Sequence, residues 1–390
     1  MLVYLALSIA AGILAGTFTG LTPAIHINLV MALIPVLGGE PFLLLFFIVA
    51  LAITHSFLDF IPSIYFGAPD EDTGLASLPG HDFLLKGLGH YAVKLSAVGS
   101  FLAVIVFLFI FPAVVFLLPA AYPFISRFLG LFLIDIAVLM IYLEKRRARA
   151  SFFVLIASGF LGLASLSLPV RNNLLPLLGG LFGSSTLIYS IRSRPLIPAQ
   201  LKDVPKEKVS LFRPAILTGA VSPVCALFPG LGSSQAAIIS SSLGRLDRKE
   251  FLVLLGSINT LVMASSLVLV FVVGKIRTGA AAALFSLKAS LPDYSIYLIV
   301  GEIFLVSIFA YFLTIFISSK LSSRIHKFDY SRISFLVLCF VSLVVLLFSG
   351  FLGFFIFFVS TFLGLLCIRL KVRRGFLMGS LLLPAIFYYF

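Results

Sequence analysis

PFLLLFFIVALAITHSFLDFIPSIYF, residues 41–66, decides the fold class, because this apolar stretch is long enough to cross a bilayer and still carries a histidine and a carboxylate. About 20 apolar residues cross the hydrocarbon core as a helix. Comparable runs fill the chain at about 2–20, 26–38, 92–120, 124–143, 151–168, 174–190, 214–243, 251–274, 279–290, 295–318, 333–348, 350–368 and 375–390. The sequence therefore predicts an all-α polytopic protein of the plasma membrane, with about 10 full spans plus two broken or re-entrant hairpins arranged as inverted repeats.

Composition excludes the soluble classes. Of the 390 residues, 61% are hydrophobic and 11% charged, and the mean hydropathy is +1.18, which rules out a cytosolic enzyme. The net charge of +13 comes from short basic clusters between apolar runs, which favours membrane topology over nucleic acid as its explanation. The three cysteines are scattered and indicate neither a disulfide nor a zinc site. No segment is long enough for a nucleotide-binding domain, and the N-terminus lacks the basic region of a cleaved signal peptide.

The basic clusters predict the topology, because Lys and Arg in short loops remain cytoplasmic. These clusters lie at 145–149, 192–213, 245–249, 320–332 and 369–374. Counting spans between them places segment 67–91 inside and both chain ends outside. The predicted organisation is a first repeat at 1–143, a connecting hairpin with basic loops at 144–213, a second repeat at 214–332, and C-terminal helices at 333–390.

Two Gly- and Pro-rich stretches, 12–38 and 214–243, interrupt apolar runs and predict the broken hairpins. Residues 21–28 align with 227–234, at an offset of 206 between Pro23 and Pro229 (229 − 23). Thr73 aligns with Thr278 at an offset of 205 (278 − 73). If the first hairpin enters from outside and the second from inside, the halves are inverted repeats with a substrate site near mid-depth.

The broken helices are the predicted substrate site, because a half-helix start offers N–H groups to an anion. The expected substrate-binding residues combine backbone breaks with polar side chains. They are Thr22, Pro23, Ala24, His26, Asn28, Pro229, Gly230, Gly232, Ser233, Ser234 and Gln235. The alternative is close helix packing by small residues, which does not require His26, Asn28 and Gln235.

His55 and Asp59, four residues apart, share a helix face inside the apolar run. A charge at this depth is costly, so Asp59 is a candidate for coupling to sodium or protons, with His55 and, more weakly, Asn259. The competing interpretation is a structural Asp–His hydrogen bond that fixes two helices. No other cofactor is expected.

Other acidic groups give weaker signals. Asp70-Glu71-Asp72-Thr73, with His81 and Asp82 nearby, lacks a ligand spacing typical of metals and is interpreted as a solvated cytoplasmic loop. Asp135 and Glu302 each interrupt an apolar run and cannot be ranked from sequence. No nucleophile elbow, P-loop or dinucleotide motif is present.

A family resemblance rests on three motifs that extend over nearly the whole chain. They are Gly16-x-x-x-Gly20-x-x-Pro23-Ala24-Ile25-His26-x-Asn28, then Phe66 to Thr73 with Leu78-Pro79-Gly80-His81, and Phe228-Pro229-Gly230-Leu231-Gly232-Ser233-Ser234-Gln235-Ala236-Ala237. With this spacing the sequence resembles the archaeal branch of the large membrane subunit of tripartite tricarboxylate transporters, the TctA-like family. One departure is Pro23-Ala24, where the family has Pro-Gly.

The resemblance implies a secondary carrier for carboxylates driven by an ion gradient, with a small membrane subunit and an external binding protein as partners. The leading hypothesis is a secondary transporter of a small organic anion that works by alternating access or an elevator-like motion, either alone or as a homo-oligomer. One alternative is a lipid-handling protein such as a polyprenyl-phosphate flippase, whose ligand would also suit paired Pro/Gly hairpins. A membrane-embedded enzyme using His26, His55 and Asp59 is a third.

Overall fold

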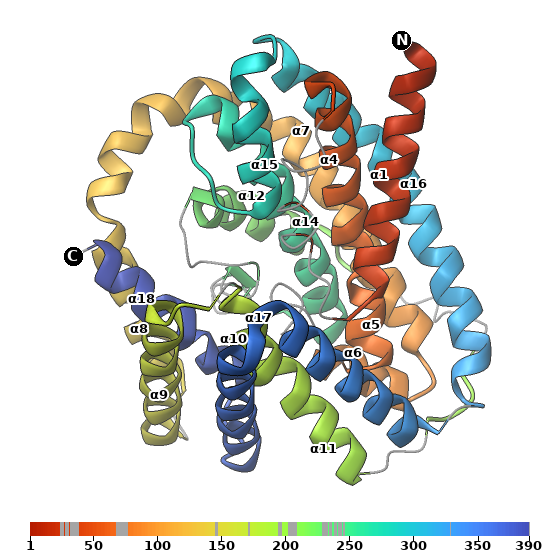
Figure 1. The fold of residues 1–390 in the computed structure, drawn as a ribbon, viewed down its shortest axis with the longest axis vertical. Coiled ribbons are helices and arrows are strands. Elements are labelled where there is room, and N and C mark those ends of the chain that lie inside the picture. The colour runs from red at the N-terminus through yellow and green to blue at the C-terminus, as the bar shows by residue number, and fades with distance from the viewer. Residues whose placement is uncertain are drawn as a thin grey trace.

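The computed structural model contains only helices and connecting loops among the residues it describes (Figure 1). These residues are 1–23, 27, 31, 39–67, 77–144, 147–170, 172–193, 197–201, 209–227, 233, 236–237, 240, 244, 246–327 and 329–389. Eight of their helices are long and apolar enough to span a membrane, and two shorter apolar helices occupy Gly130–Tyr142 and Phe212–Leu227. The all-helical membrane fold is therefore confirmed, whereas the full count of spans and the hairpins stay predictions.

The helices form two groups. The core bundle packs around α14, whose most apolar stretch is entirely buried. It comprises α1 (Leu2–Leu21), α4 (Pro41–Leu58), α5 (Phe60–Tyr65), α6 (Ser77–Leu85), α7 (Gly89–Arg127), α12 (Phe212–Leu227), α14 (Arg248–Val272), α15 (Gly279–Leu287), the 3-10 turn Lys288–Ser290 and α16 (Ser295–Ile325). The peripheral bundle comprises α8 (Leu129–Leu143), α9 (Ala148–Ser167), α10 (Leu174–Leu178), the π-helix η1 (Gly179–Ser184), α11 (Ser185–Ser193), α17 (Tyr330–Arg369), the 3-10 helix η3 (Arg374–Met378) and α18 (Gly379–Tyr389).

The two bundles are joined mainly through one junction. Among the described helices, α7 and α8 are the only pair from different bundles that packs through more than isolated contacts. The second half of α7, with Pro112, Pro119 and Pro123 inside it, arcs over the upper left of Figure 1 to reach α8. Helix α8, assigned from sequence to the first repeat, packs on α9 and α18 instead. The domain division predicted from sequence stays a prediction.

Close helix contacts in the core bundle depend on glycines. A Cβ at Gly99 of α7 would lie 2.0 Å from the carbonyl oxygen of Val253, and one at Gly256 of α14 would lie 2.0 Å from that of Ser96. Any larger side chain at either position would therefore clash with backbone. Small residues bring membrane helices together in this way, since lipid tails provide no hydrophobic drive for association.

Helix directions follow from ring contacts. Phe101 of α7 packs on Tyr311 of α16 with ring centroids 5.9 Å apart, and Phe111 packs on Tyr297 at 6.2 Å. The partner's number falls as the α7 number rises, so α7 and α16 run antiparallel. Helices α1 and α4 run parallel, because Ser8 donates to the Leu43 carbonyl while Gly20 lies against Leu58.

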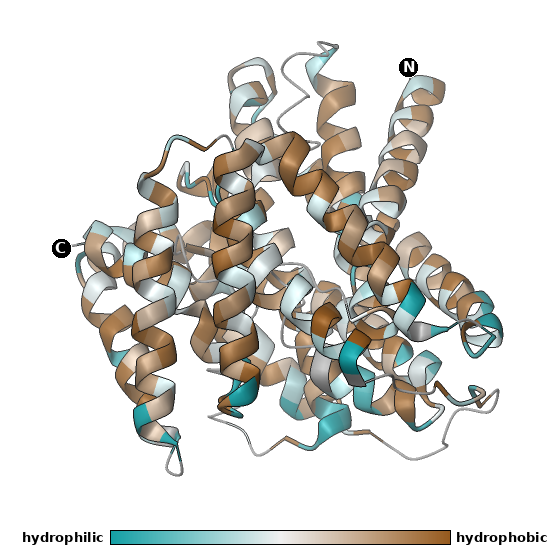
Figure 2. Cartoon of the chain, turned by 60° about the horizontal axis from the view of Figure 1, so that its bottom comes forward, coloured by the Kyte–Doolittle hydropathy of each residue, from teal (hydrophilic) through white to brown (hydrophobic). Residues whose placement is uncertain are grey.

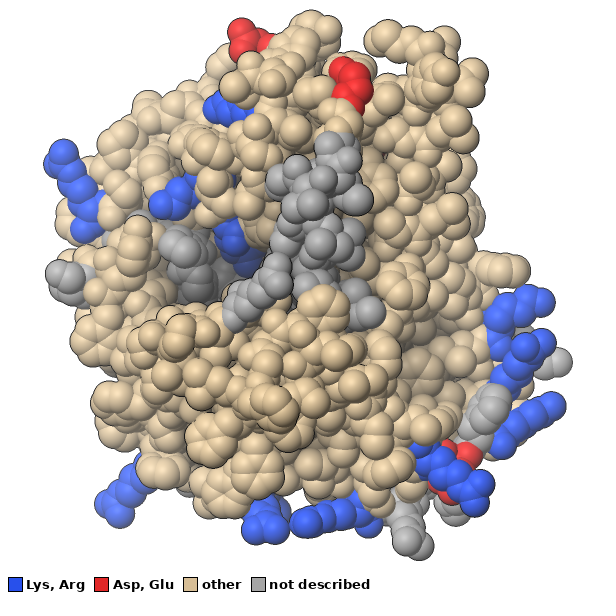
Figure 3. All heavy atoms as spheres, viewed as in Figure 1, with Lys and Arg blue, Asp and Glu red and all other residues tan. Residues whose placement is uncertain are grey.

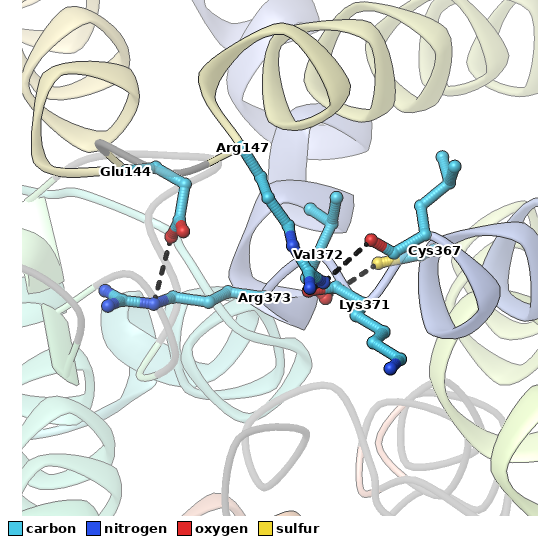
Figure 4. Close-up of polar contacts among 7 residues, drawn as sticks. Glu144, Arg147, Cys367, Lys371, Val372 and Arg373 are labelled. Atoms are coloured by element: carbon cyan, nitrogen blue, oxygen red, sulfur yellow. Dashed lines mark hydrogen bonds and ion pairs between the residues drawn. The ribbon is translucent and has the colours of Figure 1, made fainter.

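The peripheral bundle is tied together at a basic edge (Figure 4). Arg373 pairs with Glu144 at 3.0 Å, and Nη1 of Arg147 donates to the carbonyls of Leu370 and Lys371 at 3.0 and 2.7 Å. Two of the basic clusters, 145–149 and 369–374, therefore meet. The run labelled α17 consists of two helical arms that meet at Gly350, whose φ of 67° and ψ of −171° are not helical. The two arms, which Figure 1 shows meeting at a sharp turn, correspond to the expected spans at 333–348 and 350–368.

Large apolar side chains cover the outside of both bundles. Phe351 is 86% exposed and Phe109 80%, and Figure 2 shows hydrophobic residues along the helices with hydrophilic ones gathered near helix ends. Surfaces of this extent are rare on soluble monomers and match the hydrocarbon of a bilayer.

Candidate functional site

The α4 helix is interrupted at Asp59, in the middle of the opening stretch of the sequence analysis. Helix α4 ends at Leu58 and α5 begins at Phe60, with Asp59 between them and only 3% exposed. Pro62 contributes to the break, because proline has no N–H to donate to the carbonyl of Leu58 four residues before it. The carboxylate therefore sits at a local irregularity inside a buried apolar helix.

Asp59 lies beside two other predicted site residues. Nδ2 of Asn259 donates to Oδ2 of Asp59 at 2.8 Å and to the Ser56 carbonyl at 3.2 Å. The Ser233 hydroxyl donates to Oδ1 of Asn259 at 3.3 Å. Asn259 and Ser233 are each 2% exposed. We call Asp59, Asn259 and Ser233 the buried polar cluster; it joins the α4 break, the middle of α14 and the second Gly/Pro-rich stretch.

His55 lies one turn before Asp59 and faces α1. Its Nδ1 lies 2.9 Å from Oγ1 of Thr19, and that hydroxyl donates to the Gly16 carbonyl at 3.2 Å. A hydroxyl that donates to a carbonyl can accept from the ring, so this arrangement favours a hydrogen on Nδ1. His55 thus ties α1 to α4 beside the cluster.

Glycines bring the end of α1 close to the cluster. A Cβ at Gly16 would lie 2.6 Å from the Leu51 carbonyl oxygen, and one at Gly20 would lie 3.4 Å from the Asp59 nitrogen. Thr22 and Pro23 follow directly, although the Thr22 hydroxyl bonds back to the Phe18 carbonyl at 2.6 Å. The predicted residues Ala24, His26, Asn28, Pro229, Gly230, Gly232, Ser234 and Gln235 lie outside the described residues, so their roles stay predictions.

Sequence reasoning missed the hydroxyls around the cluster. Thr19 holds His55, and Ser56 lies 3.3 Å from Thr260 across the α4–α14 contact. Hydroxyl residues are common in membrane helices, and only the helix pairing distinguishes these from others. Glu302 also proves buried, at 3% exposure, whereas Asp135 is exposed on α8.

The predicted acidic loop is only partly described. Asp82 is exposed and pairs with Arg248 at 3.1 Å, while burial lowers the pKa of its neighbour His81. Within the described part of the chain no group of three His, Cys, Asp or Glu residues could hold a metal ion.

The cluster offers hard oxygen atoms from a carboxylate, an amide and a hydroxyl. Such oxygens suit alkali or alkaline-earth cations or a proton, and not soft transition metals. Among the described residues of the cluster, no nucleophile lies beside a base that could activate it.

Comparison with known proteins identifies the family. Residues 6–379 match the profile described as "Tripartite tricarboxylate transporter TctA family". The chain is also similar to an uncharacterized protein of Methanocaldococcus jannaschii, with 29% identity over 393 residues that cover 97% of each chain. No solved structure matches. The family is one of integral membrane transporter subunits and not of enzymes, and this chain belongs to the tripartite tricarboxylate transporter TctA family.

Proposed function

We propose that this protein is a secondary active transporter that moves a small organic anion, a carboxylate, with the energy of an ion gradient. The observation that carries the proposal is the buried polar cluster. In a chain of this family, an ionisable carboxylate at the α4 break meets Asn259 and Ser233 inside the core bundle. An intramembrane carboxylate is costly unless it serves a pathway or a partner.

The two bundles support an elevator-like motion. Among the described helices, contact between the bundles is confined to the junction of the consecutive helices α7 and α8 and to isolated pairs. The core bundle can therefore shift against the peripheral bundle while few helix contacts change. The proline-rich second half of α7 connects the two bundles and would have to bend during this movement. The core bundle carries the site, and the peripheral bundle is the scaffold.

Inverted repeats are supported by the helix bounds. Helices α1 and α12 end at Leu21 and Leu227, an offset of 206 (227 − 21), and α7 and α16 begin at Gly89 and Ser295, again 206 apart (295 − 89). The helix contacts between the two halves correspond in the same way. Helix α4 of the first half packs on α16 of the second, and α14 of the second half packs on α7 of the first. The corresponding helices α7 and α16 run antiparallel, as halves of opposite orientation require.

Charge supports an orientation for the membrane. In Figure 3 most Lys and Arg side chains lie along the lower edge and lower right, with others at the left, and acidic side chains stand out at the top as well as among the basic ones at the lower right. The lower right holds the basic C-terminal end of α16. By the positive-inside rule the lower edge faces the cytoplasm, where the basic loops were expected.

The proposed anion site is formed by the two Gly/Pro-rich stretches beside the cluster. Backbone N–H groups near Pro23 and Pro229 would bind carboxylate oxygens, with Asn28, Ser233, Ser234 and Gln235 as side-chain donors. The tripartite family name supports two further partners, a small membrane subunit and an external binding protein that delivers the substrate.

The test is uptake by the full-length protein in sealed proteoliposomes, with labelled citrate and a panel of dicarboxylates as probes. Sodium and pH gradients are imposed separately, and liposomes without protein are the control. We expect accumulation above the external concentration under at least one gradient, abolished by an ionophore that dissipates it. Failure with every carboxylate, together with flipping of a labelled polyprenyl phosphate, would contradict the proposal and favour the lipid-handling alternative.

A further inference from the structure

Glu302 is a buried carboxylate with no partner in the core bundle. It lies two turns into α16 and is 3% exposed. Neither of its oxygens has a hydrogen-bond partner, and it forms no ion pair with any residue that the structure describes. The buried polar cluster does not use it.

The surroundings of Glu302 are apolar. On α16 it shares a buried face with Ile299, Ile303 and Val306. The ring contacts of Tyr297 and Tyr311 place it beside the α7 segment 101–111, FLAVIVFLFIF, which contains no polar side chain. The nearest buried hydroxyls on α16 are Ser307, five residues further on, which donates to the Ile303 carbonyl at 2.6 Å, and Ser295, seven residues before Glu302, about 10 Å away along an α-helix.

No titratable group faces Glu302 from the helices packed against α16. Titratable residues are absent from α1 after Tyr4, from α4 before His55, from α7 between Lys94 and Tyr122, and from α14 after Glu250. Tyr65, at the end of α5, bonds to Ser318, sixteen residues further along α16. No described cation is therefore available to balance a negative charge at Glu302.

This environment discriminates between coupling ions. A sodium ion needs several oxygen ligands, and no described residue places a polar atom within hydrogen-bond distance of either Glu302 oxygen. A proton needs none, because it neutralises the carboxylate by forming an O–H bond. This environment therefore favours the protonated form of Glu302. Release of the proton requires that α16 move Glu302 to a position that water reaches.

We propose that Glu302 is a second coupling carboxylate, which carries a proton in the conformation described here and releases it to water when the core bundle changes position during transport. The step is R–COOH to R–COO⁻ with the proton passing to water, and it needs no other reactant. The proposal rests on the proposed function of ion-coupled transport and assigns protons as a coupling ion, independently of the ion that Asp59 takes.

The first measurement needs no substrate. Infrared difference spectra of the full-length protein in lipid are recorded between pH steps, and the C=O stretching band of a protonated carboxylic acid is followed. We expect a band that is present at neutral pH, disappears on alkalinisation and is missing from Glu302→Gln. If no titrating band is lost in Glu302→Gln, Glu302 holds no exchangeable proton and the proposal is wrong, whether or not the protein transports carboxylates.

The second measurement tests coupling with labelled citrate, or with the carboxylate that the panel identifies. A gradient of one pH unit stores about a tenfold accumulation for each proton carried. We expect Glu302→Gln and Glu302→Leu to lose about this factor while substrate exchange continues, and Glu302→Asp to retain part of it. Asp135→Asn, which removes the exposed carboxylate of α8, is the matched control and should accumulate normally.

The two measurements distinguish failure of the Glu302 proposal from failure of the proposed transport function. Normal pH-driven accumulation by both Glu302→Gln and Glu302→Leu would overturn the coupling role. Absence of carboxylate uptake by the wild-type protein would refute the proposed function alone, and the infrared titration would still decide whether Glu302 binds and releases a proton.

Discussion

Asp59 and Asn259, 200 residues apart in the chain, are joined by a hydrogen bond of 2.8 Å from Nδ2 of Asn259 to Oδ2 of Asp59. Asn259 also donates to the Ser56 carbonyl and accepts from Ser233, so its amide is held from three sides. The carboxylate at the α4 break is thus positioned by the second half of the chain. A substitution of either residue should therefore affect the packing of both halves of the chain.

Asn259→Ala should lower the free energy of unfolding by about 1.5–3 kcal/mol, because it removes a buried hydrogen bond to a carboxylate. Thr260→Val is the neighbouring control; it removes only a neutral contact with Ser56 and should cost about 0.5–1.5 kcal/mol. Denaturant unfolding in detergent measures both. Equal stability of wild type and Asn259→Ala would show that the bond contributes nothing.

Gly256→Val should destabilise the core bundle by about 1–3 kcal/mol or more, since a Cβ at this position would lie 2.0 Å from the Ser96 carbonyl oxygen. Gly301→Ala is the matched control, because a Cβ there would meet nothing within 4 Å. Thermal unfolding of the two variants compares them directly. A Gly256→Val protein as stable as Gly301→Ala would refute the close α7–α14 contact.

Arg374→Lys should lower stability by about 1–3 kcal/mol. Arg374 is 4% exposed, burial lowers the pKa of its guanidinium to about 10, and Nη1 donates to Thr186 and to the Phe182 carbonyl at the π-helix. Lysine keeps the charge but lacks the planar fork. Arg373→Lys, at an exposed arginine that pairs with the largely buried Glu144, keeps the positive charge and should change stability by less than about 1 kcal/mol. The reverse order of the two effects would contradict this account.

Asn28→Ala and Ser234→Ala test the proposed anion site. Loss of one buried hydrogen bond to a charged ligand should weaken binding by about 1.5–3 kcal/mol, which is roughly 10- to 150-fold in Kd. Binding of labelled citrate to purified protein and its uptake are measured together. If both variants bind and transport as wild type does, the substrate site lies elsewhere.

Much of this fold could be predicted from local sequence. Apolar runs long enough for a bilayer indicated the helices, and the cost of a buried charge singled out Asp59 within its run. The pairing of Asp59 with Asn259 could not be foreseen, because it depends on how α4 and α14 cross, which Gly99 and Gly256 help to set through backbone contacts. Glu302 and Asp135 looked alike in sequence, and only burial separates them. The break of α17 at Gly350 falls where the sequence analysis ends one apolar run at 348 and begins the next at 350, whereas the left-handed φ of 67° was not predicted.

The most direct test of the central claim is Asp59→Asn in reconstituted full-length protein, with each ion gradient imposed alone. Asparagine keeps the shape and the hydrogen bonding of Asp59 but removes the charge. If Asp59 couples transport to its ion, one gradient should no longer drive accumulation of labelled citrate, while exchange of internal for external citrate continues. Normal accumulation under both gradients with asparagine at position 59 would show that the Asp59–Asn259 contact is structural and contradict this role.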